Sequence, residues 1–315
     1  MGRVIGRMLL QAVGTVLVAT LAIFLLLRVL PGDAATVALG VNATPDALAQ
    51  WRVQHGTDRP LLTQYGTWLG GLLTGQFGHS FVTGRDLTPL ILDRVQVTLI
   101  LVGLGMLIAL LIAIPLGTLA AVKNRSPVGT LISSVSQVGV AVPAFLLGLL
   151  LISFFAVRLG LLPSGGWIPP AFNFGEFIRR VALPALTLGL VQAAILTRYV
   201  RAAVVDQLNQ DYLRTARAVG NRKWQALWRH GLRNAAIPIL TVAGIQIATL
   251  LIGAVVVERV FVVPGLGSML VDAVANRDLQ AVQGIVMMLV LLVVAINLLT
   301  ELAYAAIDPR IRVAQ

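Results

Sequence analysis

Six apolar stretches, each close to the length of a membrane-spanning helix, place the main constraint on this chain. They cover residues 8–30, 97–122, 133–157, 181–205, 237–257 and 283–307. A helix needs about 20 mostly apolar residues to cross the hydrocarbon core of a bilayer. The chain is also 57% hydrophobic and only 12% charged, which is typical of a polytopic membrane protein. We therefore predict an all-α membrane protein with six transmembrane helices.

The first apolar stretch could instead belong to a cleaved signal peptide. It is longer than the usual apolar region of about 7–15 residues, and Pro31-Gly32-Asp33 is a poor cleavage context. We therefore expect an uncleaved first span. Arg3 and Arg7 precede it, which favours a cytoplasmic N-terminus.

The distribution of basic residues supports the same orientation. With six spans, more than half of the 24 Lys and Arg residues fall on the side of the N-terminus, so we expect both termini in the cytoplasm. This bias also accounts for the net charge of +11. The basic residues are not interleaved with aromatic ones as in a base-stacking surface, so we expect no nucleic-acid partner.

Residues 31–96 are expected to form a small external helical insertion between the first two spans. Thr44 suits an N-cap, Pro45 suits the first helical position, and Gly56 suits the end of that helix. A second amphipathic helix is indicated around residues 61–72. The alternative is that the segment is only a spacer.

The segment 206–236 is a long basic stretch between the fourth and fifth spans. Its basic residues are Arg214, Arg217, Arg222, Lys223, Arg229 and Arg233. Its apolar or small residues recur every three or four positions and are predicted to share one helix face: Leu213, Ala216, Gly220, Trp224 and Leu227. The dipeptide Gly220-Asn221 is a turn signal, so we predict two short helices that meet there. Such a basic hairpin cannot lie in lipid and needs either a protein partner or a headgroup surface.

Several kinds of chemistry are not indicated. The chain has no cysteine, and its three histidines, His55, His79 and His230, lack the spacing of metal ligands, so we predict no metal site. The motifs of phosphate-binding loops, zinc proteases and serine hydrolases do not occur. We expect no enzymatic activity and no cofactor bound by this chain, so ATP-driven transport would need a separate ATPase.

Polar residues inside the spans are candidates for a translocation path. They are Gln137, Gln192, Gln246, Asn297 and Glu301. Asn297 and Glu301 are four residues apart and share one helix face. The other interpretation is that these side chains join helices, at about 1 kcal/mol each. The spans lack a series of acidic and histidine residues suited to proton relay, which disfavours an ion-coupled transporter.

The basic segment resembles the cytoplasmic "EAA" loop of permease subunits of ATP-binding-cassette (ABC) importers. The family pattern is Glu-Ala-Ala, three residues, Gly, nine residues, then Ile-x-Leu-Pro. This sequence keeps Ala216, Gly220 and Leu232 and departs from the pattern at Arg214, Thr215, His230 and Arg233. At these positions the sequence resembles the dipeptide, oligopeptide and nickel branch of this family. Within that branch it resembles the first of the permease subunits. Further resemblances are Pro31-Gly32-Asp33, Asp58-Arg59-Pro60-Leu61, Pro264-Gly265-Leu266-Gly267 and Asp308-Pro309-Arg310.

The resemblance implies a type I importer permease, a single domain over residues 1–315, in the bacterial cytoplasmic (inner) membrane. Its implied partners are a second similar permease, two ATPase subunits or domains that bind ATP and Mg²⁺, and an extracytoplasmic substrate-binding protein. The residues implied in ATPase coupling are Asp211, Tyr212, Arg214, Thr215, Ala216, Arg217, Gly220, Trp224, His230, Arg233 and Asn234.

The resemblance also gives candidates for docking of the binding protein, namely Pro264, Gly265, Leu266 and Gly267. We expect the two glycines to allow turns with positive φ and to leave the Leu266 side chain presented. The alternative is a plain connector between two spans.

The expected substrates are dipeptides or oligopeptides. The same machinery could instead carry nickel, glutathione or another small solute. A stand-alone secondary transporter is a further alternative, although no internal repeat typical of that class was detected, and a membrane scaffold or assembly protein is another.

Overall fold

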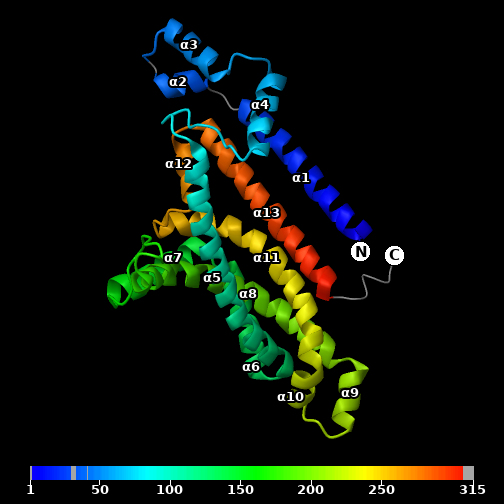
Figure 1. Ribbon diagram of the computed structural model, residues 1–315. Coiled ribbons are helices and arrows are strands. Elements are labelled where there is room, and N and C mark those ends of the chain that lie inside the picture. The colour runs from blue at the N-terminus through cyan, green and yellow to red at the C-terminus, as the bar shows by residue number, and fades with distance from the viewer. Residues whose placement is uncertain (1, 30–32, 41, 308–315) are drawn as a thin grey trace. The chain divides into compact units, whose positions relative to one another are not determined.

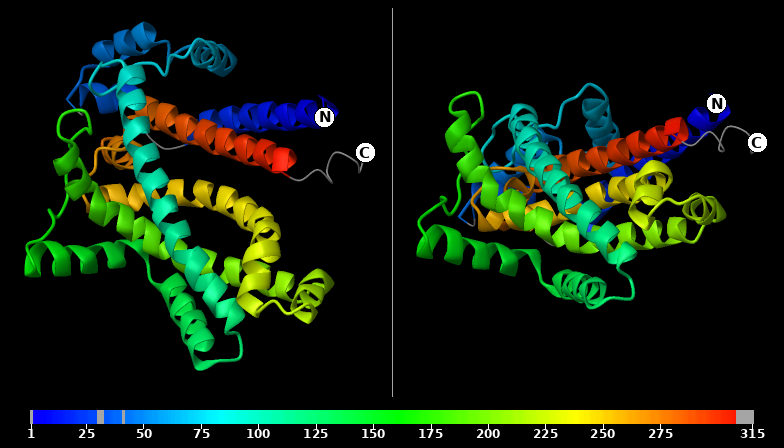
Figure 2. Two further views of the ribbon diagram at one scale, coloured as in Figure 1. Left: turned by 60° about the horizontal axis from the view of Figure 1, so that its bottom comes forward. Right: turned by 90° about the horizontal axis from the view of Figure 1, so that it is seen from below.

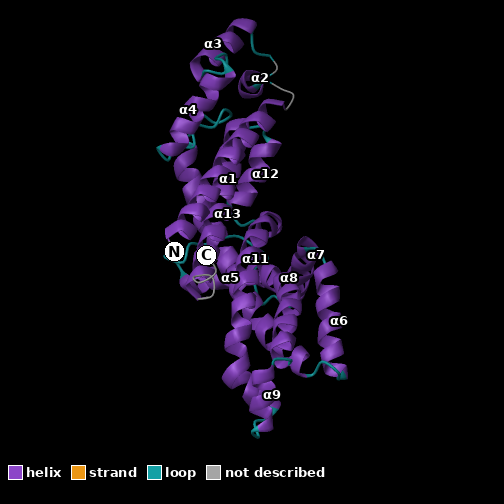
Figure 3. Cartoon of the chain, turned by 90° about the vertical axis from the view of Figure 1, so that its right-hand side faces the viewer, coloured by secondary structure: helices purple, strands orange, loops and turns teal. Residues whose placement is uncertain are grey.

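The computed structural model describes residues 2–29, 33–40 and 42–307, and within these ranges the chain is almost entirely helical (Figure 1). In chain order the helices are α1 (Gly2–Val29), α2 (Ala34–Leu39), α3 (Pro45–His55), α4 (Leu61–Leu73), α5 (Leu87–Val122), α6 (Pro127–Ala141), α7 (Ala144–Leu151), α8 (Phe174–Leu208), α9 (Asp211–Ala218), α10 (Lys223–Ala226), α11 (Leu232–Val260), α12 (Leu266–Ala275) and α13 (Leu279–Ile307). Short π-helical segments, Ile152–Arg158 and Leu227–Gly231, continue α7 and α10. No strand occurs in the described ranges (Figure 3), which confirms the predicted all-α class.

Within the described residues, five stretches are long and apolar enough to cross a membrane. They are Gly6–Arg28, Leu87–Val122, Phe174–Leu208, Lys223–Val260 and Leu279–Ala303. Each contains one of the predicted spans or most of it, which confirms an integral membrane protein. Helix α5 begins at Leu87, well before the predicted residue 97. The helix continues through the polar residues Asp93, Arg94 and Gln96, which lie outside the apolar stretch on which the prediction was based.

The third predicted span, residues 133–157, is broken rather than gently bent. Helices α6 and α7, with the π-helical segment after α7, meet at an angle of 102° (Figure 2). Val142 is extended, with φ −80° and ψ 120°, because the residue before a proline is disfavoured in the α conformation. Pro143 then begins the next helix. A proline inside a span is expected to bend the helix, and the break coincides with Pro143; the pair forms a sixth span if it crosses as one unit.

The chain divides into two compact units. Unit 1 contains Leu99–Val263 and Ile296–Gln315, and unit 2 contains Gly2–Thr98 and Pro264–Ala295. Helices α5 and α13 each contribute residues to both units. The single domain over residues 1–315 stays a prediction.

In unit 1, α8 is the central element and packs against α11 on one side and α6 on another (Figure 1). Its close approach to α5 depends on Gly189. A β-carbon at this position would lie 2.6 Å from Cγ2 of Ile108 and 3.1 Å from the carbonyl oxygen of Gly105. Small residues allow membrane helices to pack with their backbones close together. The packing of α5 on α8 is therefore set by a glycine contact.

Unit 2 contains the insertion, which is helical as predicted. Thr44 caps α3, because its Oγ1 accepts a hydrogen bond from the Ala47 N–H at 3.3 Å. Pro45 is the first residue of that helix, and Gly56 ends it in the left-handed conformation, with φ 66°. The predicted second helix is α4. Trp51 of α3 is buried and packs edge-on against Phe81, so these residues form a packed helical insertion.

The core of unit 2 joins residues that are far apart in sequence. Its buried apolar residues are Phe77, Leu87, Ile91, Leu266, Ala273, Ala281, Ile285 and Met288. The buried Asp278 carboxylate accepts hydrogen bonds from Ser80 Oγ and from the Phe81 N–H at 3.2 Å. The segment after α4 is thereby tied to the start of α13.

Candidate functional site

The basic segment 206–236 lies in unit 1 and forms the expected helical hairpin. Helix α9 and the pair of α10 with its π-helical extension are its two arms (Figure 1). The first arm begins at Asp211 and carries Tyr212, Arg214, Thr215, Ala216 and Arg217. Trp224 lies on α10, His230 lies in the π-helical segment, and Arg233 and Asn234 begin α11. The hairpin therefore brings together the residues that the resemblance implies for coupling.

Gly220 forms the bend between the two arms. Its φ is 103°, and no atom lies within 4 Å of the position that a β-carbon would take. Backbone strain rather than crowding therefore selects glycine here. The Asn221 N–H and its side-chain amide both donate to the Ala216 carbonyl, at 3.2 and 3.1 Å. The predicted turn at Gly220-Asn221 is confirmed.

The predicted single apolar face across the hairpin is wrong. Leu213 and Leu227 are fully buried against the rest of unit 1, but Trp224 is partly exposed. The face divides because the turn at Gly220 reorients the second arm relative to the first, so helical spacing does not continue across it. The apolar side chains that the hairpin exposes most are Val219, at 80%, and Trp228, at 70%. Neither was among the predicted site residues.

Polar contacts attach the hairpin to the ends of neighbouring helices. Lys223 Nζ donates to the carbonyl oxygen of Val122, the last residue of α5, at 2.7 Å. Tyr212 Oη donates to Gln207 Oε1 of α8 at 2.7 Å and accepts from Asn234 Nδ2 of α11 at 3.2 Å. The two arms are thus connected to three long helices of unit 1.

The outer surface of the hairpin is basic. The side chains of Arg214, Arg217, Arg222, Arg229 and Arg233 are all exposed. Within the part of the chain that the structure describes, only Arg214 among them has an ion pair, with Asp211 at 3.1 Å. Four arginines are therefore available to acidic groups outside this chain.

The predicted path residues occupy different environments. Gln192 of α8 is buried, and its Nε2 has no hydrogen-bond partner in the described ranges. Gln246 of α11 is half-buried, whereas Gln137 of α6 and Asn297 and Glu301 of α13 are exposed. A path lined by these residues stays a prediction.

Unit 1 also contains an apolar cavity of about 370 Å³ between α5, α11 and α13. Its lining includes Met106, Ile237, Leu240, Ile296 and Leu299, and none of the five predicted path residues lines it. Among the described residues that line it, Thr241 and Thr300 are the only ones with polar side chains. The cavity therefore does not provide the amide-lined route that was expected.

The predicted exposure of Leu266 is wrong. Leu266 is the first residue of α12, has 0% of its surface exposed and packs into the core of unit 2. Neither Gly265 nor Gly267 has a positive φ. The segment is held by its backbone: the Leu266 N–H donates to Thr98 Oγ1, and Arg94 donates to the Pro264 carbonyl, both at 2.9 Å. Docking of a binding protein at residues 264–267 stays a prediction that lacks its proposed apolar contact.

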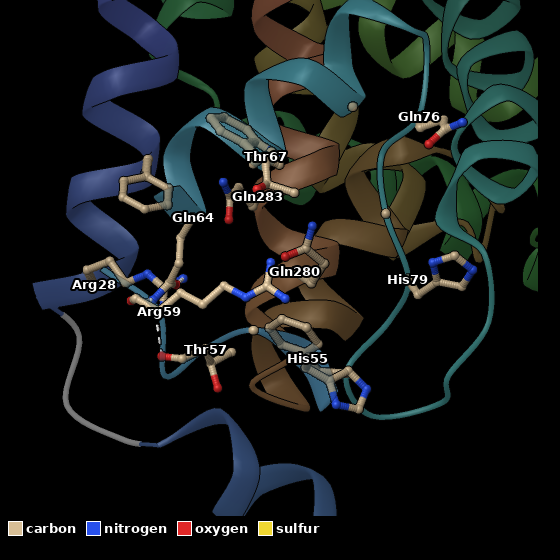
Figure 4. Close-up of a pocket in the computed structure, with 16 residues that line it drawn as sticks. Arg28, His55, Thr57, Arg59, Gln64, Thr67, Gln76, His79, Gln280 and Gln283 are labelled. Carbon is tan, nitrogen blue, oxygen red and sulfur yellow. Dashed lines mark hydrogen bonds between the residues drawn. The ribbon is translucent and has the colours of Figure 1, made fainter. Parts of the chain in front are cut away.

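Sequence reasoning missed a polar cavity in unit 2, of about 360 Å³ (Figure 4). Arg28, Arg59, Gln283 and the separated histidines His55 and His79 are among its lining residues. No group of three or more metal-ligating His, Asp or Glu side chains occurs in the described part of the chain. The separation of these residues in sequence gave no signal that they would converge.

Comparisons with known proteins cover almost the whole chain. A family model described as a binding-protein-dependent transport system inner membrane component matches residues 113–313. A second model, for the N-terminal part of such membrane components, matches residues 1–102.

Two relatives align from end to end. A protein of Brucella ovis that is provisionally named a peptide permease is 41% identical over 313 residues, which are 97% of each chain. The oligopeptide transport system permease protein AppB of Bacillus subtilis is 37% identical over 314 residues, which are 99% of each chain.

Solved structures show the same fold at lower identity. The methionine ABC transporter MetNI in an inward-facing conformation matches with a TM-score of 0.56 and 21% identity, over 70% of this chain and 96% of its own. An amino acid ABC transporter with histidines matches with a TM-score of 0.52 and 19% identity, over 70% of this chain and 94% of its own.

Proposed function

The chain belongs to the family of binding-protein-dependent transport system inner membrane components, and on that premise we propose that it forms a peptide translocation path together with a second permease. It is the membrane-embedded permease subunit of an ABC importer. In the proposed assembly, two ATPase subunits or domains supply the energy and a substrate-binding protein delivers the solute. The chain itself is non-catalytic, with ATP and Mg²⁺ bound by the ATPase partners.

The observation that best supports coupling is the exposed basic and aromatic surface of the hairpin. Trp228 and Val219 offer apolar area, and the same hairpin carries four exposed arginines without an ion pair in the described residues. Burying apolar area contributes about 25 cal/mol per Å², and association costs offset part of this gain. An ATPase groove with an apolar floor and acidic edges would complement this surface. The competing partner, an anionic membrane surface, would attract the arginines without requiring a specific aromatic contact.

Movement of the hairpin would reach the membrane helices through its polar attachments. Lys223 connects α10 to the end of α5, and Tyr212 connects α9 to α8 and α11. Closure of the ATPase dimer would displace the hairpin, and these contacts would carry the displacement to three helices. Alternation between inward-open and outward-open states would follow. Gly220 would act as the pivot because it is the point where the two arms meet.

Peptides are the proposed substrates because end-to-end relatives bear that name. Nickel, glutathione or another small solute carried by the same machinery is the alternative. A stand-alone secondary transporter is disfavoured because the chain belongs to a family of binding-protein-dependent systems.

The proposed topology places both termini and the hairpin on the cytoplasmic side and the insertion, residues 31–96, outside. The bias of basic residues supports it, since the exposed arginines of the hairpin would lie on the side where positive charge collects. Reporter fusions at Asp46 and Gly166 should read as external, and fusions at Asn124 and Asn221 as internal. An external reading at Asn221 would overturn this topology.

The function is tested by transport with the purified complex in liposomes. The complete assembly should take up a labelled dipeptide or oligopeptide in an ATP-dependent manner, and the peptide should stimulate hydrolysis. The single chain should do neither. Uptake of nickel or glutathione without peptide uptake would support the alternative substrates, and uptake by the single chain would contradict the proposed assembly.

A further inference from the structure

The polar cavity of unit 2 is formed by segments that are distant in sequence (Figure 4). The end of α1, the connection between α3 and α4, the segment after α4 and the first turns of α13 all contribute lining residues. The aromatic rings of Phe24, Trp68 and Phe81 cover its apolar parts. Its other lining side chains are mostly arginine, histidine, threonine and glutamine.

Arg28 is held in a fixed position at this cavity. Its Nη2 donates to Gln64 Oε1, and its guanidinium lies 5.2 Å from the centre of the Phe24 ring. Gln64 is itself oriented, because its Nε2 donates to the carbonyl oxygens of Thr57 at 3.1 Å and Arg59 at 2.6 Å. The remaining guanidinium donors of Arg28 are therefore pre-organised, which lowers the entropic cost of binding an acceptor.

Several buried polar atoms in the same cavity have no partner. Within the described residues, Gln283 Nε2, Trp68 Nε1 and Thr57 Oγ1 make no hydrogen bond. Gln283 is only 7% exposed, and Figure 4 shows its side chain among the residues that converge on the cavity. Buried polar groups are nearly always paired in folded proteins, so three orphans in one cavity indicate a missing ligand. Two of the three atoms are obligate N–H donors.

The charge of the lining defines the ligand further. Among the residues that the structure describes, the lining contains Arg28 and Arg59 and neither Asp nor Glu. No ion pair involves either arginine in the ranges that the structure describes. A cavity with two guanidinium groups and unpaired N–H donors suits an oxyanion, and arginine binds phosphate through several parallel hydrogen bonds.

The location of the cavity along the helices indicates where that oxyanion comes from. Arg28 ends the candidate span Gly6–Arg28, and Gln280 and Gln283 lie in the first turns of α13, where the candidate span Leu279–Ala303 begins. The cavity therefore lies where two spans leave the hydrocarbon core, at the depth of lipid headgroups. Trp68 fits this level, because tryptophan is enriched at the membrane interface.

We propose that this cavity binds the phosphate group of an anionic phospholipid. The acyl chains of that lipid would lie along α1, where Leu21, Leu25 and Leu26 are exposed. Arg28 and Arg59 would contact the phosphate oxygens, and Gln283 and Trp68 would donate to the phosphate or to the glycerol. The lipid would thereby fasten the insertion to the ends of α1 and α13.

Native mass spectrometry of the purified full-length chain tests this site. The detergent-solubilised protein is titrated with phosphatidylglycerol, and bound lipid per chain is counted. Arg59→Gln and Gln283→Leu are compared with Arg85→Gln, which removes the same charge from an exposed position of unit 2 outside the cavity. Wild type and Arg85→Gln should bind one lipid tightly, whereas each cavity variant should bind it at least about tenfold more weakly.

Gln283→Leu separates loss of ligand from loss of fold. It removes an unpaired buried amide, so the thermal stability of the lipid-free chain should be unchanged or higher. Equal lipid binding by wild type and both cavity variants would overturn the proposal, as would an equal loss in Arg85→Gln. Further titrations distinguish the source of the oxyanion. If inorganic phosphate or trialanine displaced the lipid at equimolar concentration, the cavity would be a site for a soluble anion, and the assignment to lipid would be wrong.

Discussion

The ammonium group of Lys223 donates a hydrogen bond to the backbone carbonyl of Val122 at 2.7 Å. Val122 ends α5, whose last carbonyls have no partner within the helix, and a cation at this end also interacts favourably with the helix dipole. Lys223 begins the second arm of the basic hairpin. One side chain thus joins the proposed ATPase contact to the end of a membrane helix.

Replacement of this lysine should uncouple the complex without disassembling it. Lys223→Met keeps much of the side-chain length and removes the donor. A hydrogen bond from a charged group is worth about 1.5–3 kcal/mol, so the ratio of uptake to ATP hydrolysis should fall roughly tenfold. Lys123→Met, an exposed neighbour at the end of α5, is the control and should keep the ratio of wild type. Unchanged uptake per ATP in Lys223→Met would argue against this link.

Gly220→Val should impair coupling through backbone strain. A β-branched residue is strongly disfavoured at φ 103°, at a cost of about 1–2 kcal/mol or more. The variant should insert into the membrane normally, yet lose either the ATPase subunits on copurification or the coupling of hydrolysis to uptake. Gly40→Val is the matched control, because Gly40 also has a positive φ and open space around it but lies in the insertion. If Gly220→Val copurified and transported like wild type, the pivot would be excluded.

Truncation of the exposed tryptophan should weaken the ATPase contact. Trp228 is 70% exposed on the hairpin, and central tryptophans at interfaces often contribute about 2 kcal/mol or more. Trp228→Ala should reduce the affinity for the ATPase subunits roughly thirtyfold in a pull-down titration. Phe172→Ala removes another exposed aromatic of unit 1, outside the hairpin, and should leave the affinity unchanged. Equal effects of both variants would remove the special role of Trp228.

Acid should loosen the first part of the insertion. The Arg52 guanidinium, which donates to Asp33 at 2.7 Å, is the main reason that the pKa of Asp33 lies below its usual value. A lowered pKa in the folded state stabilises the fold above the ordinary pKa of about 3.9, and this contribution is lost as the pH falls through the lowered value. Asp33 also caps α2 through the Ala35 N–H. The protection factors of the α2 and α3 amides against hydrogen exchange, which are corrected for the intrinsic exchange rate, should fall below about pH 4 in wild type.

The variant Asp33→Asn checks the cause of that acid sensitivity. Its protection factors in α2 and α3 should be lower than those of wild type already at neutral pH and should change little on acidification over this range. Asp58→Asn, in the connection between α3 and α4, should keep the acid response of wild type. Retention of the full acid response in Asp33→Asn would show that the pair with Arg52 is not responsible.

Local signals in the sequence were sufficient for most of the helices. Apolar length located the spans, and the cap residues Thr44 and Gly56 located the ends of α3. Gly220 was identified because a positive φ is a property of one residue and its neighbours. The position of Pro143 indicated the bend, although its angle of 102° depends on packing that a single residue does not reveal.

The parts that could not be predicted depend on contacts between distant residues. Leu266 is buried because it packs on α5 and α13, and nothing in its local sequence distinguishes an exposed loop residue from the start of a buried helix. The cavity in unit 2 assembles Arg28, His79 and Gln283 from three separate segments. The exposure of Trp228 could not be predicted from helical periodicity either, because the periodicity does not continue through the turn at Gly220.

Contact between the hairpin and the ATPase is the central claim, and site-specific cross-linking tests it most directly. The chain contains no cysteine, so Ala218→Cys, at an exposed position of the hairpin next to Val219, can carry a single thiol-attached photocrosslinker in the assembled transporter while Trp228 stays in place. Leu62→Cys, on α4 and 85% exposed, is the control. A covalent adduct with the ATPase subunit from position 218 and none from position 62 is the predicted result. The absence of an ATPase adduct from position 218 during turnover, in a complex that still transports, would contradict the claim.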